Sequence, residues 1–230
     1  MIRSARLLLL MLIAGCSGLD PDAAGVVSLQ VQVPALQTVE VGESLQLTAV
    51  ALDQDGQPVD AAISWRAPDP TLSVDATGLI TGVSAGTGRV QALEGSLASE
   101  LMTFTVISRP DTLMILGDSV LTVAPTDIAS APLTVSVQTF SPPATGVASV
   151  PVVYTITSPP DLGGPHTVEL SGAVLADTVL TGTDGAVSTV TLNRVAGIAQ
   201  PDTAIVEIRS SHTRGEPVSG SGQRFIVIFQ

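Results

Sequence analysis

The chain of 230 residues is acidic and rich in small apolar residues, which excludes several classes of function. It contains 21 Asp and Glu residues against nine basic residues, all Arg, and its formal net charge is −12 at pH 7. Nucleic acid and anionic lipid headgroups repel so acidic a chain, so we expect no nucleic-acid partner. Val, Thr, Ala and Gly dominate and long amphipathic helical runs are missing, which favours strands and turns.

The first 15 residues have the order of a secretory signal peptide. Arg3 and Arg6 precede the apolar run 7–14, and small residues then lead to Cys16. As a helix, the apolar run would reach only ~12 Å at about 1.5 Å per residue, whereas a bilayer core measures ~30 Å. The run is therefore too short for a membrane span.

The string Ile13-Ala14-Gly15-Cys16 resembles the lipobox of bacterial lipoproteins, in which the cysteine thiol receives diacylglycerol and becomes the new N-terminus. The resemblance implies a signal peptide at residues 1–15 and a lipid anchor on Cys16. Ser17, where enterobacterial lipoproteins retained at the inner membrane carry Asp, favours the outer membrane or the cell surface. The alternative is an ordinary signal peptide that contains a cysteine. Because Cys16 is the only cysteine, no intrachain disulfide is available.

Residues 16–25 are rich in turn formers and predict a tether of at most ~30 Å. From residue 26 to 107, apolar and polar residues alternate with the period of a half-buried strand. The run 45–51 predicts one strand with four apolar residues on one face. The expected inward positions are Leu45, Leu47, Ala49, Ala51, Ile63, Trp65, Val74, Ile80, Val90, Ala92, Phe104 and Val106. Turn formers such as Asp55-Gly56 separate the runs, and this spacing predicts a β-sandwich.

Several strings of this segment stand in a characteristic order: Val41-Gly42-Glu43, Leu47-Thr48-Ala49, Asp55-Gly56, Ser64-Trp65, Asp75, Gly78 to Val83, Ala85-Gly86-Thr87 and Phe104-Thr105-Val106. Together they resemble the group 2 bacterial immunoglobulin-like domain, over essentially the whole of residues 26–107. The resemblance implies that Trp65 packs in the core between the sheets. It also implies that Gly82 and Gly86 serve tight turns that need positive φ or a close backbone approach.

A boundary is expected at residues 108–110, and residues 111–230 predict a second sandwich. Its expected inward positions are Leu133, Val135, Val137, Val152, Tyr154, Ile156, Val168, Leu170, Val190, Leu192, Ala204, Val206, Ile208, Phe225, Val227 and Phe229. The strings 150–154, 181–185 and 225–229 resemble the immunoglobulin-like domains repeated in invasin and intimin. The predicted fold is all-β, with two tandem immunoglobulin-like β-sandwiches after a lipoprotein signal peptide.

One string suggests catalysis. Gly117-Asp118-Ser119 resembles the opening block of GDSL-type esterases, whose serine is a nucleophile that needs a general base and oxyanion donors. The later blocks of that family are absent, because the only asparagine, Asn193, precedes Arg194, and neither histidine has an acid three residues earlier. We expect a hairpin turn here and no enzyme.

Metal and sugar sites are weakly indicated. Asp53, Asp55 and Asp60 superficially resemble a calcium loop, but an Asp-Gly hairpin explains them equally well, so they remain weak calcium candidates. The two histidines, His166 and His212, lie in separate turn-rich segments and predict solvated loops rather than a zinc site. Of the six aromatic residues only one, Phe140, is expected to be exposed, which disfavours an aromatic sugar platform.

The sequence thus predicts a non-catalytic, lipid-anchored protein of the bacterial cell envelope with a structural or adhesive role and no cofactor. Its expected partners are the membrane, through the lipid on Cys16, and a protein or glycan at the cell surface. The alternative is an accessory subunit that docks an envelope enzyme or transporter through exposed strand edges.

Overall fold

The structure is a computed structural model that describes residues 25–140, 143–160, 165–199 and 201–230. The predicted signal peptide, the lipidation site Cys16 and nearly all of the predicted tether lie outside the described residues. Every regular element of the described part is a β-strand, which confirms the all-β prediction. Within it, no helix is long and apolar enough to span a membrane.

Eleven strands build the first half. They are β1 (Ser28–Val31), β2 (Thr38–Glu40), β3 (Ser44–Gln46), β4 (Ala49–Leu52), β5 (Pro58–Val59), β6 (Ser64–Arg66), β7 (Leu72–Val74), β8 (Leu79–Gly82), β9 (Gly86–Glu94), β10 (Leu97–Ala98) and β11 (Met102–Ile107). The largest sheet has the order β10-β9-β11-β2, with β6 beside β9, and two smaller sheets have the orders β1-β4-β5 and β3-β8-β7.

The expected single strand over residues 45–51 is divided between two sheets. β3 pairs with β8, whereas β4 pairs with β1 and β5. The change occurs at Leu47 and Thr48, where the Leu47 N–H donates to Gly78 and the Thr48 carbonyl accepts from Gln32. The alternation of side chains survives this change, because Leu47 and Ala51 are both buried. The correction therefore concerns the pairing and not the inward face.

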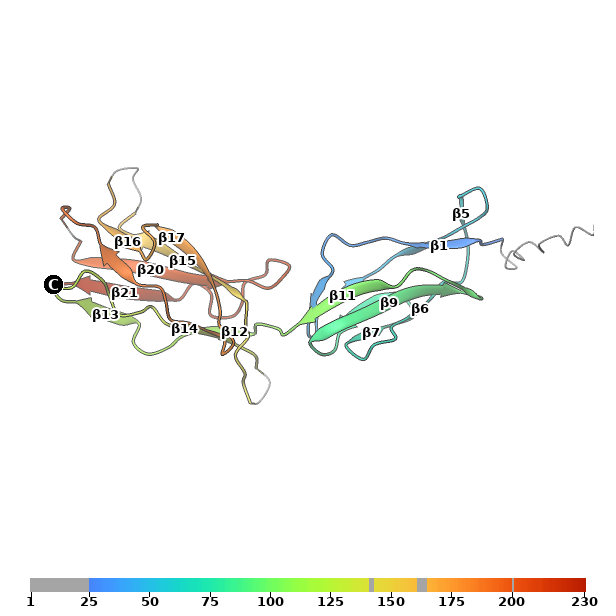
Figure 1. Ribbon diagram of the computed structural model, residues 1–230, viewed down its shortest axis with the longest axis horizontal. Coiled ribbons are helices and arrows are strands. Elements are labelled where there is room, and N and C mark those ends of the chain that lie inside the picture. Colours follow the sequence, from blue (N-terminus) through green and yellow to red (C-terminus); the bar gives the residue numbers. More distant parts are fainter. Residues whose placement is uncertain (1–24, 141–142, 161–164, 200) are drawn as a thin grey trace, which may run out of the picture.

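Ten strands build the second half. They are β12 (Thr112–Ile115), β13 (Val120–Val123), β14 (Val135–Gln138), β15 (Pro151–Ser158), β16 (Val168–Leu170), β17 (Ala176–Leu180), β18 (Ala186–Val187), β19 (Leu192–Arg194), β20 (Thr203–Ser210) and β21 (Arg224–Phe229). A five-stranded sheet, β13-β21-β20-β15-β17, accompanies the smaller sheets β12-β14-β18 and β16-β19. Among the described residues, no strand pairing or bridge joins this half to the first, and the two halves lie end to end (Figure 1).

Each half closes with the same connection. An early strand pairs in parallel with the last strand, β2 with β11 in the first half and β13 with β21 in the second. The strand just before it, β1 or β12, belongs to another sheet. Gly117-Asp118-Ser119 lies in the second of these crossings, so the expected hairpin is wrong. The bend at Gly117, whose φ is +79°, carries the chain from β12 to a different sheet.

Each half has its own hydrophobic core. One cluster is formed by residues between 39 and 106, and the other by residues between 113 and 229. All sixteen inward positions expected in the second half are buried, as are Ile80, Val90, Ala92, Phe104 and Val106 in the first. Strand alternation therefore predicted most of both cores. The domain limits and the family of each half stay predictions.

Trp65 packs against the first core without being enclosed by it. Its indole lies so close to Gly78 that a Cβ there would stand 2.7 Å from the ring, and Gly78 has a φ of +86°. The side chain stays half-buried because β6 pairs with β9 only and forms a sheet edge.

We therefore expect Trp65→Ala to destabilise the protein by about 2 kcal/mol, less than the ~3–5 kcal/mol typical of a fully buried aromatic residue. Phe104→Ala, at a position with no exposed surface, is the matched control and is expected to reach that higher range. Urea unfolding followed by circular dichroism measures both. An equal or larger loss for Trp65→Ala would contradict the half-buried placement.

A second stability prediction concerns the pKa of Glu207, which is buried on β20. Arg209 donates from Nε to its carboxylate at 2.6 Å, and Arg224 donates from Nη2 at 3.0 Å. These hydrogen bonds hold the pKa of Glu207 below its ordinary value. Because the folded-state pKa is the lower one, this stabilisation is present above the unfolded-state pKa and is lost as the pH falls through the folded-state value.

Glu207→Gln is accordingly expected to lower the midpoint of thermal unfolding at pH 7 and to make it fall less than in the wild type between pH 5 and strongly acidic buffer. Glu169→Gln, on β16 outside this ion pair, should leave the acid dependence unchanged. The interpretation fails if the two variants show the same acid dependence as the wild type.

Candidate functional site

The two halves meet where a pair of acids from the first half contacts a loop of the second. Glu40 ends β2, and Glu43 follows in the turn that leads to β3. The loop lies between β20 and β21 and presents His212, Thr213 and Arg214. More than 160 residues of sequence separate the acids from this loop, so only the folded chain brings them together.

The carboxylate of Glu40 is buried by the second half. Its Oε2 lies 2.7 Å from Nδ1 of His212, and its Oε1 accepts from the Thr213 N–H at 2.8 Å and from the Thr213 hydroxyl at 3.2 Å. The Glu40 side chain is only 4% exposed and that of His212 only 15%. A buried carboxylate needs such donors, because leaving it without them would cost several kcal/mol.

Glu43 supports the same contact. Its Oε2 accepts from the Glu40 N–H at 2.8 Å, so it fixes the end of β2. Its Oε1 forms an ion pair with Nε of Arg214, and its Oε2 accepts from the Thr213 hydroxyl at 3.4 Å. The junction thus joins two acids to one Arg and one His through hydrogen bonds to charged groups, which are stronger than neutral ones.

The local sequence explains why Glu40 stands at this position. Val39 points into the core with no exposed surface, so the next residue on the strand points outward. The backbone of Gly82 lies against that of Glu40. A Cβ at Gly82 would stand 2.5 Å from the Glu40 carbonyl oxygen. Close backbone approach therefore explains Gly82, and positive φ (+145°) explains Gly86, as the family resemblance implied.

The connecting segment between the halves is short and bonded. β11 ends at Ile107 and β12 begins at Thr112. The Ile107 carbonyl accepts from Val41 at 2.9 Å, and the Asp111 N–H donates to Gln138 at 2.9 Å. Beside this segment lies a mainly apolar cleft of about 690 Å³, lined by both halves. Chain connection and side-chain contacts therefore constrain the junction together.

The calcium candidates do not gather into a metal site in the structure. Asp53 accepts from the N–H groups of Asp55 (2.9 Å) and Gln57 (2.8 Å) and so shapes the hairpin between β4 and β5. Asp60 follows β5 on the exposed surface. In the described part of the chain, no group of three or more His, Cys, Asp or Glu side chains is placed to hold a metal ion.

The structure places the other candidate residues as follows. Ser119 is exposed just before β13, and its carbonyl accepts from the Ile226 N–H at 2.8 Å. Phe140 is 68% exposed, as expected, and His166 is exposed. His212 is not the solvated loop residue that was expected, because Glu40 and the first half cover it. Nothing in the Ser-Ser-His-Thr string signals this contact, since its partner lies in the other half.

Comparisons with known proteins identify no family. No family model matches the chain, and no curated protein matches it. The adhesin InvE of Yersinia pseudotuberculosis is similar in structure, with a TM-score of 0.41 and 16% identity over 90% of this chain and 61% of that one. The chain thus spans about three fifths of that adhesin.

Two further solved structures are similar. Domains 4 and 5 of the S-layer protein SbsC give a TM-score of 0.34 and 18% identity over 90% of this chain and 99% of that one. The D00-D0 domain of intimin gives a TM-score of 0.34 and 18% identity over 88% and 99%. At such identities and TM-scores, the function of this chain has to be argued from its own residues.

We expect Glu40→Ala to uncouple the two halves, because the variant removes the acceptor of three contacts. Leaving a buried donor without its acceptor costs ~1–3 kcal/mol in general, and this sets the range of the expected coupling. Trp65 is the only tryptophan, so its fluorescence follows unfolding of the first half, and circular dichroism follows both halves. In the variant, the fluorescence midpoint should shift to lower urea and separate from that of circular dichroism.

The matched control is Glu100→Ala, an exposed acid of the first half away from the junction. It should leave both unfolding midpoints where the wild type has them. If Glu40→Ala leaves the two transitions as they are in the wild type, the contact does not couple the halves.

Proposed function

We propose that the protein is a non-catalytic, lipid-anchored surface module of the bacterial cell envelope that holds its second sandwich at a set distance from the membrane. The observation that carries this proposal is the junction, where Glu40 and Glu43 bind the loop 212–214. A chain whose halves are tied by both a short connection and side-chain bonds acts as a spacer rather than as two freely moving domains.

The arrangement of the chain supports a spacer. The described residues begin at one end of the molecule, and the C-terminal residue lies at the opposite end (Figure 1). If Cys16 carries the lipid, the second sandwich stands farthest from the membrane. The first sandwich lies between the two, within the reach of a short tether.

The lack of a nucleophilic centre at Ser119 supports a non-catalytic role. Nucleophilic catalysis needs a base within hydrogen-bond reach of the serine hydroxyl. His212 is bonded to Glu40 at the junction, and Ser119 lies in the crossing before β13. The role that remains is mechanical or adhesive.

The anchor is tested by Cys16→Ser. Because only the thiol can form the thioether with the lipid, the variant should lose metabolic labelling by an alkyne fatty acid and move to the soluble or uncleaved fraction. Ser17→Ala, which keeps the thiol, is the matched control and should be labelled like the wild type. A wild-type protein that takes up no label would exclude the lipid anchor.

A further inference from the structure

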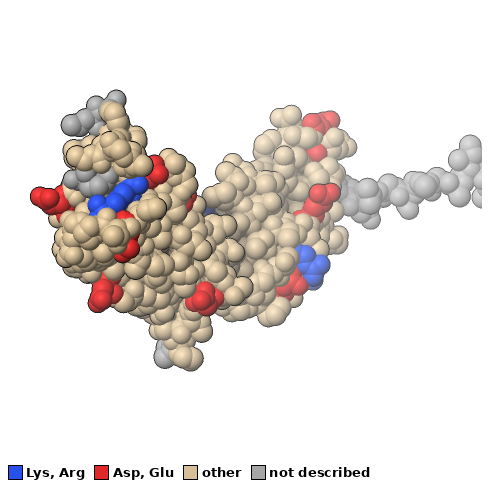
Figure 2. Space-filling view, turned by 60° about the vertical axis from the view of Figure 1, so that its left-hand side comes forward, with Lys and Arg blue, Asp and Glu red and all other residues tan. Residues whose placement is uncertain are grey.

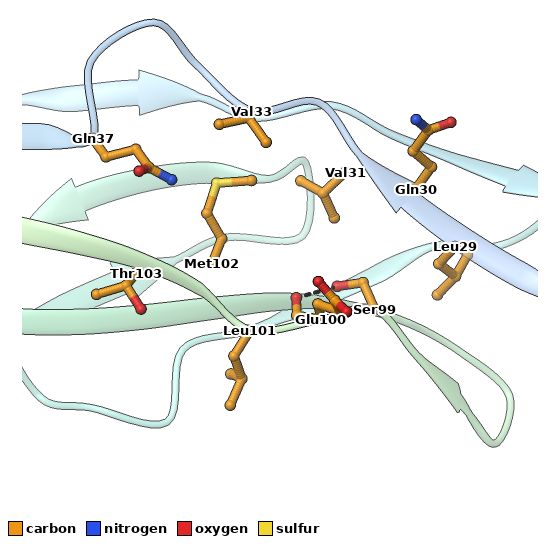
Figure 3. Close-up of a pocket in the computed structure, with 10 residues that line it drawn as sticks. All are labelled: Leu29, Gln30, Val31, Val33, Gln37, Ser99, Glu100, Leu101, Met102 and Thr103. Atoms are coloured by element: carbon orange, nitrogen blue, oxygen red, sulfur yellow. Dashed lines mark hydrogen bonds between the residues drawn. The ribbon is translucent and has the colours of Figure 1, made fainter.

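An open groove lies on the first sandwich, between the edges of two sheets. β1 and the segment 32–37 form one wall, and the segment 99–103 at the start of β11 forms the other (Figure 3). The groove has a volume of about 510 Å³. It opens because β2 begins only at Thr38 and covers β11 from Thr105 onward, which leaves the start of β11 uncovered on this side.

The backbone of β11 offers free bonding groups to this groove. The Thr105 N–H donates to Gln37 at 2.9 Å, so the odd-numbered residues of β11 face the side on which β2 lies. By strand alternation, Thr103 directs its N–H and C=O to the same side, beyond the end of β2. In the described part of the chain, no backbone acceptor is bonded to the Thr103 N–H there.

The wall formed by β1 also presents backbone N–H and C=O groups that have no strand partner among the described residues. The Gln32 N–H donates to Thr48 at 2.9 Å, so even-numbered residues face β4. Leu29 and Val31 therefore direct their N–H and C=O groups away from β4, at the open edge of their sheet. Such unpaired edges are templates for an added strand.

The groove is lined by apolar and polar side chains in about equal number, and one of them is charged. Val31 and Met102 lie between the walls in Figure 3, and Val33 above them is 65% exposed. Glu100 is the only charged residue among the described residues that line the groove. The exposed apolar surface favours β-branched side chains in an occupant, and Glu100 favours a basic residue at its end.

We propose that this groove binds an extended basic peptide segment of a partner protein, which adds a strand to the open edge of β11. The stretch of chain before Thr105 that β2 leaves uncovered has room for about four residues of an added strand, at ~3.3 Å per residue. Charge selects a foreign segment over a second copy, because this chain carries a net charge of −12 and contains no Lys. Figure 2 shows acidic side chains scattered over both lobes of one face and few basic ones, which would steer a basic partner toward the protein. The proposal does not depend on the lipid anchor.

The probe is the acetylated and amidated peptide Lys-Val-Thr-Val-Thr-Lys, titrated into the purified full chain in low salt and followed by amide chemical shifts. The amides of Val31 and Thr103 are expected to shift most. Glu100→Lys should weaken binding about tenfold or more, because it places like charges together. Asp55→Lys makes the same change of charge in the exposed hairpin between β4 and β5 and should leave binding unchanged.

Further arms of the experiment separate strand addition from other contacts. The peptide with Pro at both Thr positions lacks the donors on one edge of the strand and cannot form a regular ladder there, so it should not bind. The variant Thr103→Pro removes the edge donor of the protein, and circular dichroism checks that it still folds; the proline peptide decides the question if it does not. Equal binding of the two peptides would overturn the proposal, and so would the absence of any shift at millimolar peptide. Self-association through this groove that Glu100→Lys abolishes would also overturn it, by making a second copy the occupant.

Discussion

The carboxylate of Glu40 is the contact on which the arrangement of the two halves depends. It stands on the outward face of β2, so the first sandwich alone would leave it in water, and the loop 212–214 of the second sandwich covers it instead. Among arrangements that bury this carboxylate, the contact favours the one that supplies the donors of this loop, because a buried carboxylate without them would cost several kcal/mol. The connection of four residues between β11 and β12 restricts how far apart the two halves can lie, but it does not fix their orientation by itself.

Both halves also solve the same topological problem. In each half the first segment serves two sheets, because it crosses between them after one strand. In the second half the crossing takes residues 116–119, and β13 then lies along β21. In the first half it takes the longer segment 32–37, and among the described residues the start of β11 pairs with β9 alone.

The ionic groups serve these two features in different ways. At the junction, acids of one half meet basic and hydroxyl groups of the other, and the charges are largely withdrawn from water. At the groove, Glu100 is exposed to solvent, so salt screens its charge. A charge of this kind affects mainly the rate at which a partner associates. The proposed spacer role depends on the first kind of contact, and the proposed recognition of a peptide depends on the second.

The sequence by itself determined the fold class and most of both cores. A period of two places apolar side chains on one face of each strand, and that rule holds for Phe104, Tyr154 and Phe225 whatever their strands pair with. Trp65 was assigned the right face, but its coverage depends on which strands flank β6. The family resemblance also implied either a positive φ or a close backbone approach at Gly82, without indicating the residue that approaches it.

Only the tertiary structure decided the pairing and the site. Alternation says which face of a strand is inward and is silent on which sheet it joins, so the division of residues 45–51 and the crossing at Gly117-Asp118 could not be read in advance. The contact of Glu40 with His212 joins residues 172 positions apart in the chain, and both are ordinary polar residues of a strand end and a loop. The periodicity of the local sequence determines which side chains are buried. Contacts between the halves depend on how two folded domains are placed relative to each other, and no local sequence pattern corresponds to that placement.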